Sequence, residues 1–213
     1  MNRVPNPLID ELAGDLVPVR PISLARGVAL VALAAIATVV AVELFHGLWR
    51  GAFSGQASGF FFIANGMLGL LGAASALAVL RMASPRVGNG HEGARWSAAM
   101  LGLLPISALL VLGFDGLTSE LTHDVEGFHC FLAGSGFSLL TAGALVLWLR
   151  SGAPVSIGSA SLYTGIASGA IGSFAYGMAC PIDTMGHLGI WHVAPVALCA
   201  LVGKLVIPRL VRW

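Results

Sequence analysis

The segment from Cys180 to His192, CPIDTMGHLGIWH, gathers side chains that can bind metal ions or undergo redox chemistry. Its thirteen residues include a thiol at Cys180, a carboxylate at Asp183 and imidazoles at His187 and His192. Thiolates and imidazoles are ligands of soft and borderline metal ions. However, six residues separate Cys180 from His187 and four separate His187 from His192, and this spacing matches no standard zinc module. The segment alone therefore predicts no defined metal site.

A second segment with similar chemistry, DGLTSELTHDVEGFHC, covers residues 115–130 and ends with His129 and Cys130. Cys130 and Cys180 can share a soft metal ion as thiolates, or they can form a disulfide, which oxidising compartments favour. The candidate additional ligands are His129, Asp183, His187 and His192. A simpler interpretation of His46, His123 and His187 is that they end helices or form hydrogen bonds in loops.

The composition indicates an integral membrane protein. Of the 213 residues, 57% are hydrophobic and only 10% are charged, whereas soluble domains carry about 25% charged residues. The net charge of +1 gives no electrostatic basis for direct binding of nucleic acid.

Six windows of about 20 mostly apolar residues predict six membrane-crossing helices. They cover residues 27–48, 60–80, 96–114, 128–149, 155–178 and 188–207, and Pro105 falls inside the third. The expected fold is an all-α polytopic membrane bundle of six transmembrane helices. Residues 1–26 would be a cytoplasmic tail, residues 27–207 the transmembrane sensor domain, and residues 208–213 a cytoplasmic end.

The distribution of Lys and Arg predicts the orientation of the bundle. Ten of the eleven basic residues fall on the side that holds both termini, and only Arg50 falls on the other side. Because cytoplasmic loops are enriched in Lys and Arg, both termini are expected to be cytoplasmic. Five of the six histidines and two of the three cysteines then lie at the outer face, while Cys199 lies inside the sixth span as a packing residue.

The tail sequence NPLIDELAGDLVPVRPI predicts a short amphipathic helix, which Pro18 and Pro21 would end. Its apolar stripe consists of Leu8, Ile9, Leu12 and Leu16. A helix of about three turns is not stable alone in water, so the stripe must be buried against something. The acidic residues at positions 10, 11 and 15 disfavour anionic lipid, which leaves a groove on a partner protein as the better candidate.

The window 155–178 carries a stripe of small residues, each four positions from the next: Ser161, Gly165, Gly169, Ser173 and Gly177. Small residues on one helix face let a second backbone approach closely, which favours helix association in a bilayer. The stripe therefore predicts a tightly packed seam that ends close to the CPIDTMGHLGIWH segment.

Together, the tail LIDELAGDLVPVRPI, the six spans, a cysteine near the fourth span and CPIDTMGHLGIWH before the sixth resemble the NrsF-type membrane anti-sigma factors. These are negative regulators of an extracytoplasmic-function sigma factor. The likeness covers nearly the whole chain, and its most specific parts are the DLVPVRP ending of the tail and the CPIDTMGHLGIWH segment.

The resemblance implies a multi-pass protein of the bacterial inner membrane that is not an enzyme and needs no cofactor. Its tail, from Leu8 to Arg20, would hold the sigma factor inactive. Cys130 and Cys180 would sense heavy metal, through reversible binding of that metal or zinc, or would sense an oxidant, and the sigma factor would then be released.

Two other classes of protein remain open at this stage. In a small metal transporter or channel, the outer cluster would be an entry site, although the spans carry few ionisable groups toward the membrane centre. In a membrane redox or haem protein, two histidines would hold the haem, although no facing pair at matching depth is evident in the sequence.

Overall fold

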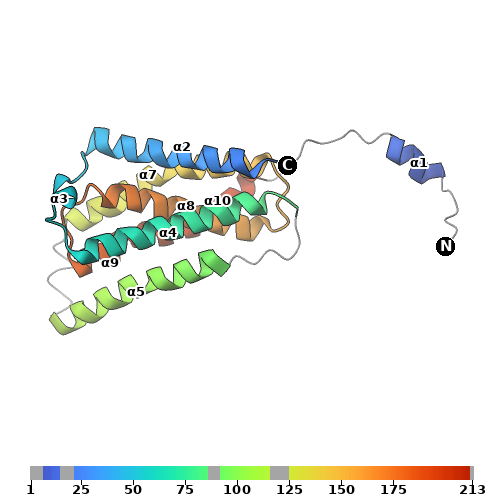
Figure 1. The fold of residues 1–213 in the computed structure, drawn as a ribbon. Helices are drawn as coiled ribbons and strands as arrows, with labels where there is room; N and C mark the ends of the chain where they lie inside the picture. Colours follow the sequence, from blue (N-terminus) through green and yellow to red (C-terminus); the bar gives the residue numbers. More distant parts are fainter. Residues whose placement is uncertain (1–6, 15–21, 86–91, 116–124, 212–213) are drawn as a thin grey trace.

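The computed structural model describes residues 7–14, 22–85, 92–115 and 125–211, and the described residues are helical apart from short connections (Figure 1). The helices are α1 Pro7–Gly14, α2 Leu24–Phe45, α3 Arg50–Phe53, α4 Gly59–Met82, α5 Glu92–Asp115, α7 Val125–Arg150, α8 Ile157–Gly177, α9 Met185–Trp191 and α10 Ala194–Val211. This confirms the all-α prediction for the described part of the chain.

Five segments among the described residues are long and apolar enough to cross a membrane. They are Leu24–Phe45, Gly59–Met82, Glu92–Leu110, Glu126–Arg150 and Met185–Val211. They correspond to five of the six predicted spans, and Pro105 lies inside a continuous α5. The other predicted span corresponds to α8, which is not among the five because glycine, serine and threonine dilute its apolar residues.

The helix α8 lies at the centre of the bundle, where α4, α7 and α10 pack around it (Figure 1). All five residues of its predicted small-residue stripe are buried. A methyl group at Gly165 would overlap the carbonyl oxygen of Cys199 in α10, and one at Gly169 would lie 2.8 Å from the Cα of Val196. The stripe therefore forms the predicted close seam, and its partner helix is α10.

The end of α8 differs from the prediction. The sequence suggests that Pro181 leaves Cys180 as the last helical residue, but α8 ends at Gly177 with Met178 as its C-cap, so this prediction is wrong. The backbone N–H of Cys180 donates to the carbonyl oxygen of Gly177 at 3.3 Å, which closes a turn beyond the helix. Cys180 therefore lies in a connecting segment rather than on a helix.

The last candidate span is divided into α9 and α10 by a turn at His192 and Val193. Pro195 stands in the first turn of α10. Proline has no backbone N–H, so it cannot donate to the carbonyl of Trp191 four residues earlier, and its ring is incompatible with a continuous helix at this position. His192 thus lies within the span, as predicted, but at the break between two helices.

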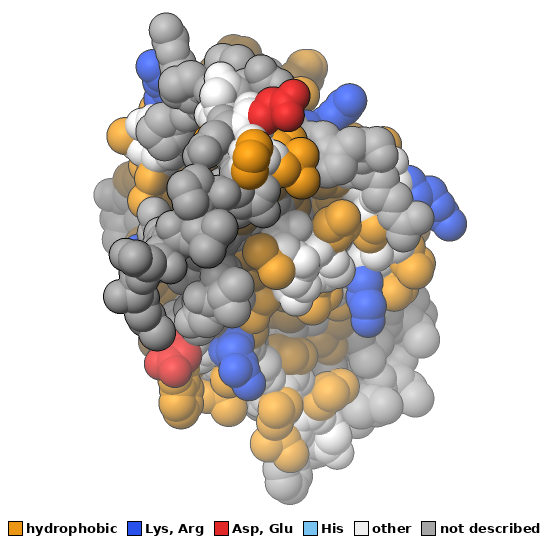
Figure 2. All heavy atoms as spheres, turned by 90° about the vertical axis from the view of Figure 1, so that its right-hand side faces the viewer, with side chains coloured by type: hydrophobic (Ala, Val, Ile, Leu, Met, Phe, Trp, Pro, Cys, Tyr) orange, Lys and Arg blue, Asp and Glu red, His pale blue; other side chains and the backbone are white. Residues whose placement is uncertain are grey.

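The basic side chains of the long helices gather at one end of the bundle. Exposed Arg and Lys side chains stand in the first turns of α2 and α5, in the last turns of α4 and α7, and toward the end of α10; they are Arg26, Arg81, Arg95, Arg150, Lys204 and Arg209. Figure 2 views the molecule from the side toward which this end points, and basic side chains lie at several places around it. Arg50 lies at the opposite end, as the first residue of α3.

The amphipathic helix of the tail is present as α1. Leu8 and Leu12 are 60% and 61% exposed, so the apolar face that they form is available at the surface. Leu16, Arg20 and the side chain of Ile9 lie outside the described residues.

The seam between α8 and α10 can be tested with two matched glycine substitutions on α8. Gly165→Ala should lower the Tm in detergent by several degrees, because overpacking a tight contact costs about 1–3 kcal/mol. Gly158→Ala is the control, because an added methyl group there meets no atom within 4 Å. The control should keep or raise the Tm, since alanine favours a helix over glycine by about 1 kcal/mol. Equal Tm values for the two variants would contradict the close seam.

Candidate functional site

Four of the residues singled out in the sequence meet at the end of the bundle opposite the basic residues. Cys130, Cys180, His187 and His192 are all buried, and one ligand atom from each lies within 4.8 Å of the others. The Sγ atoms of Cys130 and Cys180 are 3.8 Å apart, and the Sγ of Cys180 is 3.4 Å from Nε2 of His187. The rings of His187 and His192 have centroids 5.4 Å apart. We call these four residues the Cys/His cluster.

The members of the Cys/His cluster come from three parts of the chain: α7, the segment after α8, and α9 with its C-cap. Cys130 is in the second turn of α7, and Cys180 is in the segment that follows α8. His187 is in the first turn of α9, where its backbone N–H donates to the N-capping hydroxyl of Thr184 at 3.4 Å. His192 is the C-cap residue of α9. The cluster therefore depends on the mutual packing of α7, α8 and α9 rather than on a local motif.

The surroundings of the cluster are apolar. Cys130 and Cys180 belong to a core cluster with Val42, Ala175 and Tyr176. His192 is 2% exposed, and its Nε2 has no hydrogen-bond partner among the described residues. A buried polar group without a hydrogen-bond partner lowers the stability of the fold, so Nε2 of His192 is a candidate atom for binding a ligand.

Aromatic rings pack beside the cluster. The ring of Tyr176 stacks near the ring of His192, with centroids 6.4 Å apart. It also contacts the rings of His46 and His129, at centroid distances of 5.1 Å and 6.1 Å. His46 and His129 are exposed and do not belong to the Cys/His cluster. Sequence reasoning did not single out Tyr176, although its position in the last turn of α8, four residues before Cys180, is a usable signal.

Asp183, the remaining candidate ligand, also lies outside the cluster. Its Oδ2 accepts a hydrogen bond of 2.8 Å from the backbone N–H of Ser58, the N-cap residue of α4. The same connecting segment is held a second time, because the backbone N–H of Trp49 donates to the carbonyl of Met178 at 2.9 Å. The segment that carries Cys180 is thus hydrogen bonded to the N-cap residues of both α3 and α4.

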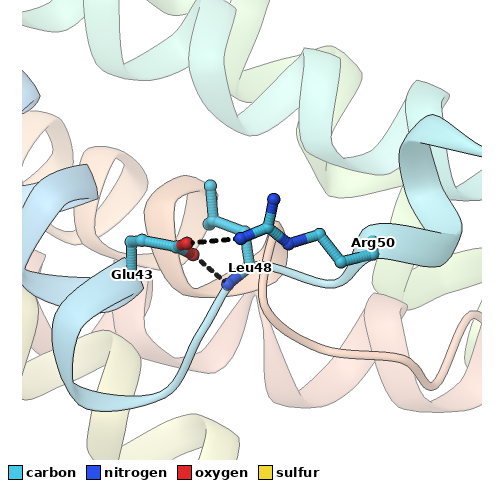
Figure 3. A network of polar contacts seen from close by, with 3 residues as sticks. All are labelled: Glu43, Leu48 and Arg50. Atoms are coloured by element: carbon cyan, nitrogen blue, oxygen red, sulfur yellow. Dashed lines mark hydrogen bonds and ion pairs between the residues drawn. The ribbon is translucent and has the colours of Figure 1, made fainter.

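The connection from α2 to α3 is itself braced beside this segment (Figure 3). One carboxylate oxygen of Glu43 accepts from the guanidinium of Arg50 at 2.9 Å, and the other accepts from the backbone N–H of Leu48. Arg50 is mostly exposed, so the ion pair contributes little to stability by itself. Its effect is to fix the path of the chain that leads to Trp49.

The surroundings of Cys180 favour ionisation of its thiol. Its pKa is held well below the ordinary value, first by the hydrogen bond between the sulfurs of Cys180 and Cys130, with smaller contributions from His187 and His192. Burial opposes this shift. A thiolate is the form that binds metal ions and attacks disulfides, so the surroundings prepare Cys180 for both kinds of chemistry.

Comparison with known proteins connects this geometry to a family. A family model described as negative regulator of sigma F (NrsF) matches residues 12–213. The chain belongs to the NrsF family. This confirms the resemblance carried by the tail and by the CPIDTMGHLGIWH segment.

Two relatives of this NrsF-family protein extend the finding. The chain is 33% identical over 156 residues to the anti-sigma-F factor NrsF of Caulobacter vibrioides, and the match covers 68% of this chain and 69% of the relative. It is 25% identical over 154 residues to the probable anti-sigma-F factor NrsF of Azospira oryzae, and the match covers 72% of each chain. No solved structure shows a significant match.

The separation of the two sulfurs predicts which cysteines an oxidant joins in this NrsF-family protein. A disulfide needs the sulfurs at about 2.05 Å, so the observed 3.8 Å requires only a small local movement. Diamide treatment of the purified full chain should link Cys130 to Cys180 within one molecule, as measured by peptide mapping after alkylation. Cys199→Ser should give the same product, because Cys199 contacts Ser138 instead. A main product that contains Cys199, or that joins two chains, would contradict the arrangement.

Proposed function

We propose that the protein is an inner-membrane anti-sigma factor. It holds an extracytoplasmic-function sigma factor inactive and releases it when Cys130 and Cys180 bind a heavy metal or become oxidised. The family match over residues 12–213 carries the negative regulation of a sigma factor. A role in regulation rather than in enzyme catalysis agrees with this family. The buried sulfur pair at 3.8 Å supports the sensing function.

The partner surface in this proposal is the apolar face of α1. Leu8 and Leu12 lie one helical turn apart and are both largely exposed, with Glu11 exposed beside them. Amphipathic helices of this kind bind by laying their apolar side chains into a groove of another protein. Both relatives are named as anti-sigma-F factors, which supports a sigma factor as the occupant of that role.

The proposed topology has six spans, with both termini in the cytoplasm. The helix α8 is included as a further span, the fifth along the chain, because its 21 residues match the lengths of its neighbours and it packs between candidate spans. A span surrounded by other helices does not need an apolar exterior, so its low hydropathy is no obstacle. The basic side chains at one end of the bundle favour that end as cytoplasmic. The Cys/His cluster then faces the periplasm.

The outer surface of the bundle supports contact with membrane lipid. An apolar groove of about 630 Å³ runs between α2 and α4 and reaches α8. Its lining includes Val28, Ile36, Leu77 and Phe174. Large exposed apolar residues are common on α2, α5 and α7, as expected where acyl chains replace water.

The coupling between the two ends can pass through α8 and its neighbours. The sulfurs of the Cys/His cluster connect α7 to the segment after α8, and α8 is in close backbone contact with α10 along the glycine seam. Moving a two-state switch from 1:99 to 99:1 takes about 5.5 kcal/mol of differential binding. Structural zinc sites in peptides supply about 10–16 kcal/mol, so part of that free energy is sufficient.

The tail can be tested by co-purification from the native bacterium. Full-length tagged protein should retain a sigma factor, identified by mass spectrometry, and a version that lacks residues 1–20 should not. The double variant Leu8→Asp with Leu12→Asp should reduce the retained amount at least a hundredfold, because each buried Leu anchor contributes about 1.5–3 kcal/mol. Gly14→Ala on the same helix is the control and should retain the sigma factor. Undiminished capture by the double variant would exclude the tail as the binding segment.

The sensing function can be tested separately with a sigma-dependent reporter. Cys130→Ser and Cys180→Ser should each abolish induction by cadmium or dichromate, because either change removes one half of the sulfur pair. Cys199→Ser should leave induction intact, since Cys199 lies in α10, outside the Cys/His cluster. A normal response in both cluster variants would refute sensing at this pair while leaving the anti-sigma function in place.

A further inference from the structure

We propose that His187 and His192 join Cys130 and Cys180 as the four ligands of one buried site for a borderline divalent cation such as zinc, cadmium or cobalt. The proposal rests on the function proposed above, which assigns sensing to the sulfurs alone. It adds the donor set, and with it the class of cation that the site accepts.

Two distances within the cluster match those that a tetrahedral cation imposes. Zinc lies about 2.3 Å from thiolate sulfur and about 2.0–2.1 Å from imidazole nitrogen. A tetrahedral angle then places two sulfur ligands about 3.8 Å apart and a sulfur and a nitrogen about 3.5 Å apart. The observed separations are 3.8 Å between the sulfurs and 3.4 Å from Cys180 Sγ to His187 Nε2. The Sγ of Cys180 therefore already lies at the spacing of a bound ion from two other ligand atoms, the Sγ of Cys130 and Nε2 of His187.

An unsatisfied nitrogen supports His192 as the fourth ligand. Nε2 of His192 is buried without a hydrogen-bond partner among the described residues, and His192 lies within the 4.8 Å group. A cation at the centre of the cluster would provide that partner. The helix break at His192 is compatible with this role, because the side chain of a residue at a helix end is not confined to one face of a continuous helix.

The charge of the donor set suits a buried divalent cation. Two thiolates and two neutral imidazoles bring the total charge with a divalent cation to zero, which reduces the cost of placing an ion in apolar surroundings. The candidate carboxylate, Asp183, is already hydrogen bonded to Ser58. Sulfur and imidazole ligands without carboxylate favour zinc-like ions over magnesium or calcium.

Cation binding and disulfide formation must compete at this site. Diamide takes two electrons and two protons from the thiols, so that one S–S bond forms and the N=N bond of the reagent becomes an N–N bond with two N–H groups. Sulfurs that coordinate a cation are not available for this reaction. A bound cation should therefore protect Cys130 and Cys180 from diamide.

The coordination can be measured on the purified full chain in detergent without any activity assay. Zinc-loaded wild-type protein should show one zinc per chain, and X-ray absorption should resolve two sulfurs at about 2.3 Å and two imidazole nitrogens at about 2.0–2.1 Å. Zinc should also slow diamide cross-linking of Cys130 to Cys180 at least tenfold. A sulfur-only shell, or oxygen in place of imidazole, would overturn the proposal.

Variants then assign the nitrogens. His187→Gln and His192→Gln should each weaken zinc binding at least tenfold, and cobalt-loaded forms should keep the thiolate charge-transfer band while the tetrahedral d–d band decreases. His129→Gln is the control, because His129 is exposed and outside the cluster. Unchanged zinc affinity in both His variants would overturn the proposal.

The failure of this site and the failure of the sensing function can be told apart. Zinc bound by two sulfurs and two nitrogens, together with normal induction in the Cys130→Ser and Cys180→Ser reporters, would keep the zinc site and refute sensing. Loss of induction in those reporters, together with a sulfur-only zinc shell, would keep sensing and refute the four-ligand site.

Discussion

The bundle depends on how closely other backbones approach α8. In a bilayer there is no hydrophobic force between helices, so association depends on close packing and on polar contacts. Glycine at positions 165 and 169 lets the backbone of α10 come into direct contact, and Gly172 does the same for the backbone of α7 at Gly134. Because α8 touches both neighbours without intervening side chains, the proposed sensing mechanism gives a displacement at its end a direct route to them. The small residues of α8, which is not among the five candidate spans, are therefore the residues that let its neighbours pack closely against it.

The position of the Cys/His cluster follows from the same packing. The seam fixes the end of α8. The turn after Gly177 then brings Cys180 to within hydrogen-bonding distance of Cys130, near the start of α7. Pro195 ends the continuity of the last span and leaves His192 at the break. Asp183 and Trp49 then fasten the loop to the neighbouring connection. The site is thus built from contacts of long sequence separation, and it can exist only in the assembled bundle.

The sequence predicts those features that depend on local composition and on the spacing of apolar or small residues. It placed five spans, the amphipathic tail helix and the small-residue stripe, and it paired Cys130 with Cys180 across fifty residues through charge bias and resemblance. It failed where tertiary contacts decide. Cys180 is not the last helical residue, because α8 ends three residues earlier. The sequence does not predict that His187 and His192 belong to the cluster while His129 and Asp183 do not. Nothing local shows which imidazole is buried or which carboxylate is already bonded to a backbone N–H.

The separation of the two ends of the molecule limits how a signal can travel. The Cys/His cluster and the basic residues stand at opposite ends of helices that are each more than twenty residues long, such as α4 and α7. A pair of sulfurs that moves by less than 2 Å cannot reach that far through flexible loops, because loops absorb small displacements. It can do so through a helix in backbone contact with its neighbours, since packed interfaces resist gradual deformation and shift between discrete arrangements. In the proposed sensing mechanism, the glycines that hold the bundle together would therefore be the physical route by which chemistry at one end alters the other.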